Sequence, residues 1–348
     1  MTVGVSELRF LPFGGGSVAY EVRGKGPPLV LPAWWISHLD LDWRNDAFRR
    51  FWESLSEGYT LVRYDRLGVG MSDRETGVEG VTLDSEVALL GALLDELGLE
   101  RVTMLGGSTG GCTALAFAAR YPQRVERLLL YGAYADGPSI SAPDVRAAII
   151  ATVRSHWGLG SRVLADLFLG DTSGAERESF VRFQREAASA ETAAMLLDLV
   201  YRIDIRAMLP LVRAPTVVVH RKGDRAVPYR LGRDLAAAVP NAGLVPLQGS
   251  AHFPWAGDGD SVVRAFRSAS RSAPLRHELT GEPASVLLSR REREVLALVA
   301  RGLSDREIAQ QLVLSPHTVH RHVANIRHKL GRGSRTAAVA EAARLGLL

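Results

Sequence analysis

Short apolar segments alternate with longer helical patterns through most of this 348-residue chain. The apolar segments are candidate strands, at residues 28–31, 59–64, 102–105, 125–130, 216–219 and 243–247. The intervening segments carry apolar residues at helical spacing, as at residues 82–97, 109–121 and 229–238. Continuous apolar strands that alternate with helices are typical of a parallel sheet covered by helices on both faces. The sequence therefore predicts an α/β domain over residues 1–270.

Two segments of this domain depart from the alternation. Residues 9–23 contain three consecutive glycines, Gly14 to Gly16, which predict an antiparallel hairpin at the edge of the sheet. Residues 136–209 contain helical patterns without a clear strand. A separate small helical domain is one interpretation of this segment. We favour a helical lid over the site, because both ends of the segment return to the same sheet.

Composition places the chain among ordinary globular proteins. Apolar residues make up 47% and charged residues 23%. We see no signal peptide at the N-terminus and no apolar stretch near the ~20 residues that span a bilayer, so no membrane contact is expected. The single cysteine, Cys112, excludes an internal disulfide and fits a reducing cytoplasm, with core packing as its expected role. No motif for a metal, a phosphate or a nucleotide is visible, so we expect no metal and no cofactor.

A glycine-rich turn with a serine at its centre follows one predicted strand and begins a predicted helix. Residues 106–110 are Gly-Gly-Ser-Thr-Gly, and the glycines allow a sharp turn that exposes the Ser108 hydroxyl. A serine nucleophile needs a base, and the base needs an acid that orients it. His252, after the last strand, is the candidate base. Asp224 is the candidate acid, and Asp136, after an earlier strand, is the alternative.

Residues 1–270 resemble the α/β-hydrolase family in several motifs that follow the family's order. Ser108, Asp224 and His252 occur in the chain order of that fold. Residues 65–72, Asp-Arg-Leu-Gly-Val-Gly-Met-Ser, resemble the loop after the family's fourth strand. The resemblance implies a catalytic triad of these three residues.

The resemblance also implies an oxyanion hole, and here the chain departs from the family pattern. The backbone N–H groups of Thr109 and Trp34 are the expected donors. Where the family has His-Gly, this chain reads Pro-Ala-Trp-Trp at residues 32–35, which puts efficient turnover in doubt. Trp34 and Trp35 are either an apolar wall of a ligand pocket or core aromatics. The sequence leaves both roles open.

Basic charge is concentrated in the last 65 residues. Residues 284–348 contain 11 Arg or Lys and 5 Asp or Glu, a net charge of +6, whereas the rest of the chain carries −2. A small basic segment beside a near-neutral body is typical of nucleic-acid binding, although a solvated charged surface would give the same count. A linker without any period, residues 271–283, precedes this segment.

Four short helices are predicted in the basic segment. Serine stands at the expected start of each, at residues 289, 304, 315 and 334, and glycine ends two of them, at residues 302 and 331. Residues 288–296, 302–309, 318–322 and 325–331 resemble the LuxR-type DNA-binding domain. The resemblance implies a helix-turn-helix that binds double-stranded DNA as a homodimer, paired through the last helix at residues 336–345.

The resemblance assigns a role to each side of the third helix, which would enter the major groove. Four outward residues would face base edges: His317, His320, Arg321 and Ala324. Three would contact phosphates: Thr318, Arg327 and Lys329. Three would pack inward: Val319, Val323 and Ile326.

The fold class predicted from these features is an α/β-hydrolase sheet domain with a helical lid, followed by a small all-α helix-turn-helix domain. Two functions are compatible with these sequence features. The first is a cytoplasmic transcriptional regulator whose hydrolase-like domain senses a small ester- or lactone-like ligand. The second is an active serine hydrolase for carboxylic esters or lactones with an appended DNA-binding tail. The complete triad favours the second, and the DNA-binding motif with the altered oxyanion segment favours the first.

Overall fold

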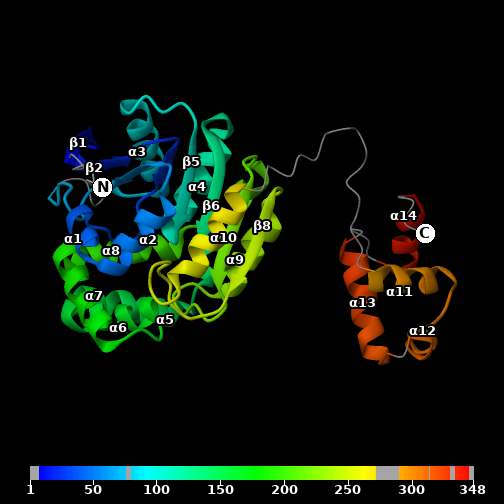
Figure 1. Cartoon of the computed structure of the whole chain (residues 1–348). Coiled ribbons are helices and arrows are strands. Elements are labelled where there is room, and N and C mark those ends of the chain that lie inside the picture. The colour runs from blue at the N-terminus through cyan, green and yellow to red at the C-terminus, as the bar shows by residue number, and fades with distance from the viewer. Residues whose placement is uncertain (1–7, 76–79, 272–289, 313, 330–333, 345–348) are drawn as a thin grey trace. The chain divides into compact units, whose positions relative to one another are not determined.

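A computed structural model describes residues 8–75, 80–271, 290–312, 314–329 and 334–344 (Figure 1). The chain divides into two compact units, residues 1–275 and 276–348. The linker predicted at 271–283 lies outside the described residues except for Arg271.

The larger unit is built on an eight-stranded sheet with the strand order β1-β2-β4-β3-β5-β6-β7-β8. β1 and β2 form the predicted antiparallel hairpin at one edge, β2 pairs antiparallel with β4, and the remaining pairs are parallel. The predicted parallel sheet is therefore confirmed. The strands are β1 (Leu8–Phe13), β2 (Gly16–Gly24), β3 (Pro28–Leu31), β4 (Thr60–Tyr64), β5 (Val102–Gly107), β6 (Val125–Tyr131), β7 (Thr216–Arg221) and β8 (Ala242–Leu247).

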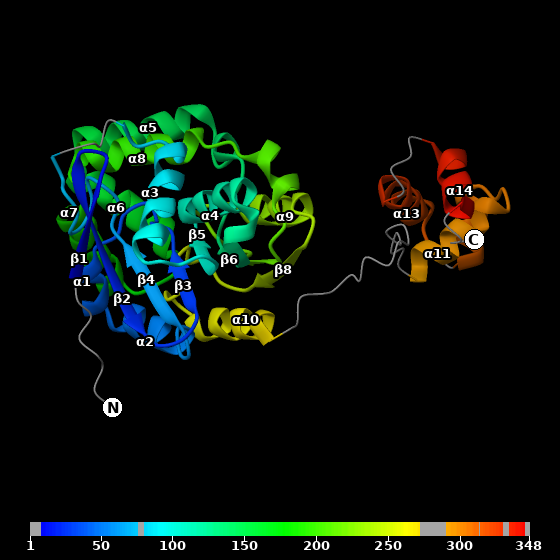
Figure 2. The same cartoon turned by 90° about the horizontal axis from the view of Figure 1, so that it is seen from above.

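Helices cover both faces of this sheet, as Figure 2 shows. One face carries α3 (Leu83–Glu96), α4 (Thr109–Arg120) and α9 (Tyr229–Ala238). The other carries α2 (Asp46–Leu55) and α10 (Gly259–Arg271), with the short α1 (Leu39–Arg44) before α2. The connections also contain the 3₁₀ turns η2 (Pro122–Arg124), η3 (Gly137–Ser139) and η4 (Arg206–Leu211).

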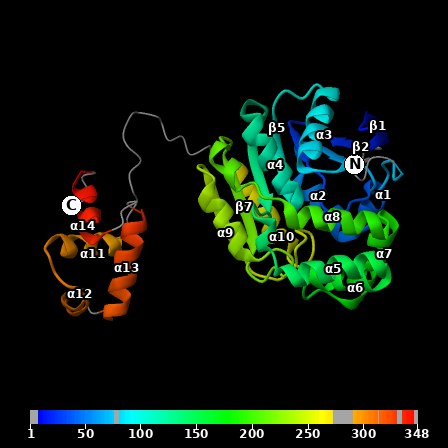
Figure 3. The same cartoon turned by 180° about the vertical axis from the view of Figure 1, so that it is seen from behind.

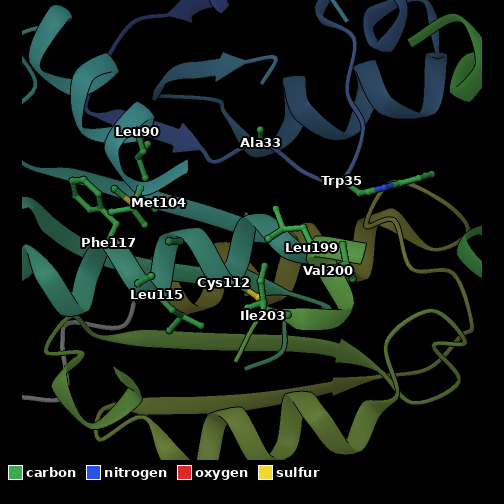
Figure 4. Close-up of a cluster of buried hydrophobic side chains, with 14 of the residues drawn as sticks. Ala33, Trp35, Leu90, Met104, Cys112, Leu115, Phe117, Leu199, Val200 and Ile203 are labelled. Carbon is green, nitrogen blue, oxygen red and sulfur yellow. The ribbon is translucent and has the colours of Figure 1, made fainter. Parts of the chain in front are cut away.

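Successive residues of the central strands point into different cores, because side chains alternate between the faces of a sheet. In β6, Leu128 and Leu130 join the core beneath α3 and α4, whereas Leu129 joins the core beneath α2 and α10. Figure 4 shows part of the first core, where Cys112 is drawn among the buried side chains. Cys112 is fully buried and its thiol donates to the carbonyl of Tyr134, which confirms its predicted packing role.

Four helices between β6 and β7 form the predicted lid. They are α5 (Pro143–Ser155), α6 (Trp157–Leu169), α7 (Gly174–Ala187) and α8 (Ala190–Arg202), and they lie side by side in Figure 3. Leu196, Leu197 and Leu199 of α8 join the core shared with α3 and α4. The lid is thus a packed part of the larger unit and not a separate helical domain.

The smaller unit contains α11 (Arg290–Ala300), α12 (Asp305–Leu312), α13 (Pro316–Lys329) and α14 (Arg335–Arg344) around a core of its own. Three predicted caps are confirmed: Ser304 and Glu307 bond each other's backbone N–H groups, and the hydroxyls of Ser315 and Ser334 accept from the first turns of α13 and α14. Ser289 and Gly331 lie outside the described residues. None of the helices described for this chain has the length and apolar character that a membrane crossing requires.

Candidate functional site

Ser108 occupies a strained turn between β5 and α4. Its φ of 51° and ψ of −126° make it the one non-glycine residue with a positive φ in the described part of the chain. Such a conformation costs free energy and occurs mainly where it has a use. Gly110 permits the turn to pack closely, since a Cβ at this position would lie 2.5 Å from the carbonyl oxygen of Pro32. The local geometry is the sharp strand-to-helix turn that the sequence predicts.

The structure brings Asp224, and not Asp136, to His252. The Nδ1 atom of His252 lies 2.8 Å from Oδ2 of Asp224. The other carboxylate oxygen, Oδ1, accepts the backbone N–H groups of Ala226 and Val227 at 2.9 and 3.0 Å. Asp136 instead bonds the hydroxyl of Ser139 at 2.7 Å and lies 3.2 Å from Arg206.

The surroundings of Asp224 keep it ionised. Burial alone would raise its pKa, but the His252 ring and hydrogen bonds from His220 and His252 hold the pKa below its usual value. An ionised Asp224 fixes the proton of His252 on Nδ1 and leaves Nε2 with a free lone pair. Within the described residues Nε2 of His252 makes no hydrogen bond. A general base requires a ring nitrogen that is not already bonded to another group.

Ser108 and His252 both lie against the segment of residues 131 and 132. The N–H of Ser108 donates to the carbonyl of Tyr131 at 3.0 Å. The next residue, Gly132, lies against His252, since a Cβ there would be 3.0 Å from Cε1 of the imidazole. The hydroxyl of Ser108 and Nε2 of His252 are not hydrogen-bonded to each other in this structure. Ser108 and His252 therefore both contact the segment of residues 131 and 132, and their roles as nucleophile and base stay predictions.

A side chain of the lid closes the site. The Phe168 ring of α6 stacks on His252, with 5.6 Å between ring centroids and 26° between planes. The backbone reinforces this contact, because the N–H of His252 donates to the carbonyl of Phe168 at 2.7 Å. Ser108 is 8% exposed and His252 1%. Neither of the two cavities that the structure describes is lined by Ser108, Asp224 or His252.

The two predicted oxyanion donors come from different segments of the larger unit. Thr109 is the first residue of α4, and Trp34 lies in the loop after β3. None of the hydrogen bonds described for this chain uses the N–H of either residue. Their role in an oxyanion hole stays a prediction.

The two adjacent tryptophans have different surroundings. Trp34 stacks on Phe253, with 5.9 Å between centroids, and lines a cavity of ≈ 230 Å³. Trp35 lines neither described cavity, and a role for it in a ligand pocket stays a prediction. Its indole N–H donates to the carbonyl of Ala193 on α8, and its ring contacts Phe168, so Trp35 is a core aromatic beneath the lid (Figure 4).

Arg221 holds the loop that carries His252, and sequence reasoning did not identify it. It is 1% exposed. Its guanidinium donates to the carbonyls of Ala251 at 3.0 Å, Phe253 at 3.2 Å and Asp258 at 3.0 Å. An arginine at the end of an apolar strand is the only signal in the sequence, and that signal does not reveal that the buried guanidinium donates to several carbonyls of one loop.

A second histidine, His220, lies close to Asp224. The Nε2 atom of His220, on β7, is 2.9 Å from the carbonyl of Val227 and 3.5 Å from Oδ2 of Asp224. His220 is completely buried. It approaches the same carboxylate oxygen of Asp224 as His252 does and restricts the position of that carboxylate.

The third helix of the smaller unit, α13, has an inward and an outward side. Val319, Val323 and Ile326 are buried in the core of this unit, as predicted. Two of the residues predicted to face base edges, His320 and Ala324, are exposed. The side chains of His317, Arg321 and Lys329 lie outside the described part of the structure.

Three residues of α13 that were expected to contact DNA are bonded to other residues or are partly covered. The hydroxyl of Thr318 lies 2.8 Å from that of Ser315, so it serves the helix cap, and Arg327 is half-buried. His320 lies 3.5 Å from Asp305, a carboxylate that also pairs with Arg335 at 2.6 Å. Asp305 therefore lowers the positive potential near His320 at the start of the outward face.

Comparisons with known proteins agree with both units. Residues 35–155 match the family described as alpha/beta hydrolase fold, and residues 286–342 match the family described as bacterial regulatory proteins, luxR family. A 2-hydroxy-6-oxononadienedioate/2-hydroxy-6-oxononatrienedioate hydrolase of Cupriavidus pinatubonensis is 31% identical over 210 residues, which cover 58% of this chain and 72% of the relative.

Solved structures give the same fold for the larger unit. The enol-lactonase of Burkholderia xenovorans LB400 superposes with a TM-score of 0.63 at 23% identity, covering 75% of this chain and 99% of that protein. The esterase of Exiguobacterium antarcticum superposes with a TM-score of 0.66 at 21% identity, covering 74% and 97%. The chain therefore belongs to the α/β-hydrolase fold family, and its C-terminal residues form a LuxR-type DNA-binding domain.

Proposed function

We propose that this protein is a transcriptional regulator whose hydrolase-fold domain senses a small ester- or lactone-like ligand at Ser108. The observation that carries the proposal is the Asp224–His252 pair beside a strained serine, in a chain that also has a LuxR-type DNA-binding domain. The relatives named an enol-lactonase and an esterase support a ligand with an activated carbonyl group. An enzyme without a regulatory role has no evident need for the second domain.

The chemistry available at this site is acyl transfer to serine. His252 Nε2 would accept the hydroxyl proton as Oγ of Ser108 forms a bond to the carbonyl carbon. The N–H groups of Thr109 and Trp34 would stabilise the oxyanion. When the intermediate collapses, the bond to the leaving oxygen breaks and His252 returns the proton to it. Water, activated by the same histidine, would then release the acid and restore Ser108.

Closure of the site favours sensing over rapid turnover. Phe168 covers His252, and Ser108 is nearly inaccessible, so ligand entry and product exit both require movement of the lid side chains. A bound ligand or acyl group would consequently favour one arrangement of the lid. The second candidate function, an active ester or lactone hydrolase with a DNA-binding tail, is favoured by the complete acid–base pair and predicts rapid turnover instead.

Pairing of two chains on DNA is part of the proposal. The small residues Thr336, Ala340 and Ala343 are exposed along α14, whereas Ala338 and Ala342 are buried in the core of their own unit. A helix with small outward residues allows close approach of a second copy. We expect a homodimer that contacts two DNA half-sites.

The test compares DNA affinity with and without ligand, using duplexes selected from a random pool by the full chain. A panel of phenyl esters and of γ- and δ-lactones is added to the full chain and to residues 284–348 alone. We expect a hydrolysed or bound member of the panel to change the DNA affinity of the full chain by about 5- to 150-fold, the usual range of coupling between sites. The isolated segment should not respond.

Ser108→Ala separates two forms of the mechanism. If occupancy is the signal, this variant binds the ligand and responds; if the acyl-enzyme or the product is the signal, it binds without responding. A ligand that demonstrably binds the hydrolase-fold domain but leaves DNA affinity and oligomeric state unchanged would refute the sensor. The second candidate function would then remain.

A further inference from the structure

An aromatic cavity of ≈ 230 Å³ lies among α1, α2, α7 and the segment after His252. Its wall includes Trp34, Phe48, Phe253 and Trp255. These rings contact one another: Phe48 and Trp255 have centroids 4.8 Å apart, and Phe253 and Trp255 stack at 4.9 Å and 14°. Aromatic faces of this kind bind flat rings by stacking and edge contacts.

This cavity is separate from the serine site. Ser108, Asp224 and His252 do not line it. Trp34 forms part of its wall and at the same time packs against Gly107, where a Cβ would lie 1.9 Å from the indole ring. The tryptophan ring thus occupies the space beside the turn that carries Ser108. A molecule in the cavity would touch Trp34 without reaching the nucleophile.

One buried carboxylate supplies the polar group of the cavity. Asp42 of α1 is 9% exposed and lines the cavity. Its Oδ2 accepts from Arg63 and from the N–H of His38, whereas Oδ1 makes none of the hydrogen bonds that the structure describes. Burial raises the pKa of Asp42 to about 7, in spite of the opposing effect of Arg63. A ligand donor at Oδ1 would add a hydrogen bond to this carboxylate and stabilise its ionised form.

The charges around Asp42 select against ionised ligands. Arg63 is 4% exposed, lines the cavity, and is held by Asp42 and by Glu21 at 3.1 Å. Its guanidinium lies 4.5 Å from the centre of the Phe48 ring. Because Arg63 and Asp42 are paired with each other, a cationic ligand would compete with Arg63 for the carboxylate, and an anionic ligand would compete with Asp42 for the guanidinium. A neutral donor avoids both penalties.

The volume limits the ligand to one or two rings. A cavity of about 150 Å³ lined by apolar side chains holds benzene. The present cavity is roughly half as large again, which suits a single substituted ring or two fused rings. Exposed charged residues, Arg44, Glu176, Arg182 and Glu186, form its polar mouth.

We infer that this cavity is a second ligand site, which binds a neutral aromatic compound of one or two rings bearing an N–H or O–H donor. The ring packs against Phe48, Trp34 and Trp255, and the donor bonds Oδ1 of Asp42. The site does not require chemistry at Ser108, so it stands or falls independently of the proposed function.

Indole and benzofuran test this inference, because they share one shape and differ in the donor N–H. Both are titrated calorimetrically into the full chain. We expect indole to bind about 10-fold more tightly or better, since a hydrogen bond to a charged group has that effect. Asp42→Leu should abolish the preference for indole. Asp40→Leu, an exposed position of the same helix, is the matched control and should retain it.

Three further measurements keep the test decisive. Ser108→Ala should leave both affinities unchanged, which separates this site from the serine site. If Asp42→Leu does not fold, Trp255→Ala should weaken indole and benzofuran to a similar degree, because it removes ring contacts and keeps the carboxylate. Equal affinities of the wild-type chain for both probes, binding of neither, or tighter binding of benzoate or benzylamine than of indole would overturn the inference.

Discussion

Treatment of the full chain with a fluorophosphonate is expected to modify Ser108 covalently. The strained turn presents the hydroxyl, and His252 has a free Nε2 to accept its proton. Ser108→Ala should abolish the modification. His252→Ala should slow it about 10²- to 10⁴-fold, the usual contribution of a general base. The measurement is a time course of intact-protein mass.

The acid is tested in the same experiment with a matched pair of variants. Asp224→Asn should slow modification strongly, because an amide in that place no longer fixes the proton on Nδ1 of His252. Asp136→Asn should leave the rate unchanged, since Asp136 bonds Ser139 and Arg206 instead. Modification that persists in Ser108→Ala would show that the strained turn does not carry the nucleophile.

Residues 284–348 are expected to bind duplex DNA without the rest of the chain, because their helices share a core of their own. Arg321→Ala should cost about 1–3 kcal/mol on the selected sequence through loss of a base contact. Lys329→Ala should weaken selected and random DNA alike and reduce the salt dependence, as expected for a phosphate contact. Fluorescence anisotropy over a series of salt concentrations measures both effects.

A basic residue outside α13 provides the control for these two variants. Arg301 follows α11, and Arg301→Ala should have a smaller effect than either variant of α13. Unchanged binding of the selected sequence by Arg321→Ala would mean that this face of α13 does not read bases.

The sequence predicts the sheet well because its central strands, such as β4 and β5, are buried on both faces and therefore mostly apolar. β3 begins and ends at the predicted residues. β5 is longer than predicted, because Gly106 and Gly107 lack side chains that favour a strand but still pair with Leu130 and Tyr131 of β6. Such an extension depends on the neighbouring strand and is not visible in the segment itself.

Chain order predicts which residues approach the site, but not which of them touch. Asp224 and Asp136 both follow strands of the sheet, and only the contact with His252 distinguishes them. Trp34 and Trp35 are adjacent in sequence, yet one lines a cavity and the other bonds the lid. Closure by Phe168 and support by Arg221 arise from residues distant along the chain, so no local pattern indicates them.

DNA affinity of the full chain with Ser108 phosphonylated tests the central claim most directly, because occupancy of the site is then covalent and can be counted by mass. Ser108→Ala treated in the same way is the control, and residues 284–348 alone are the second. The account predicts that complete modification changes the affinity of the full chain for its selected sequence by at least about 5-fold, with both controls unaffected. Complete modification that leaves DNA affinity and oligomeric state as they were would contradict it.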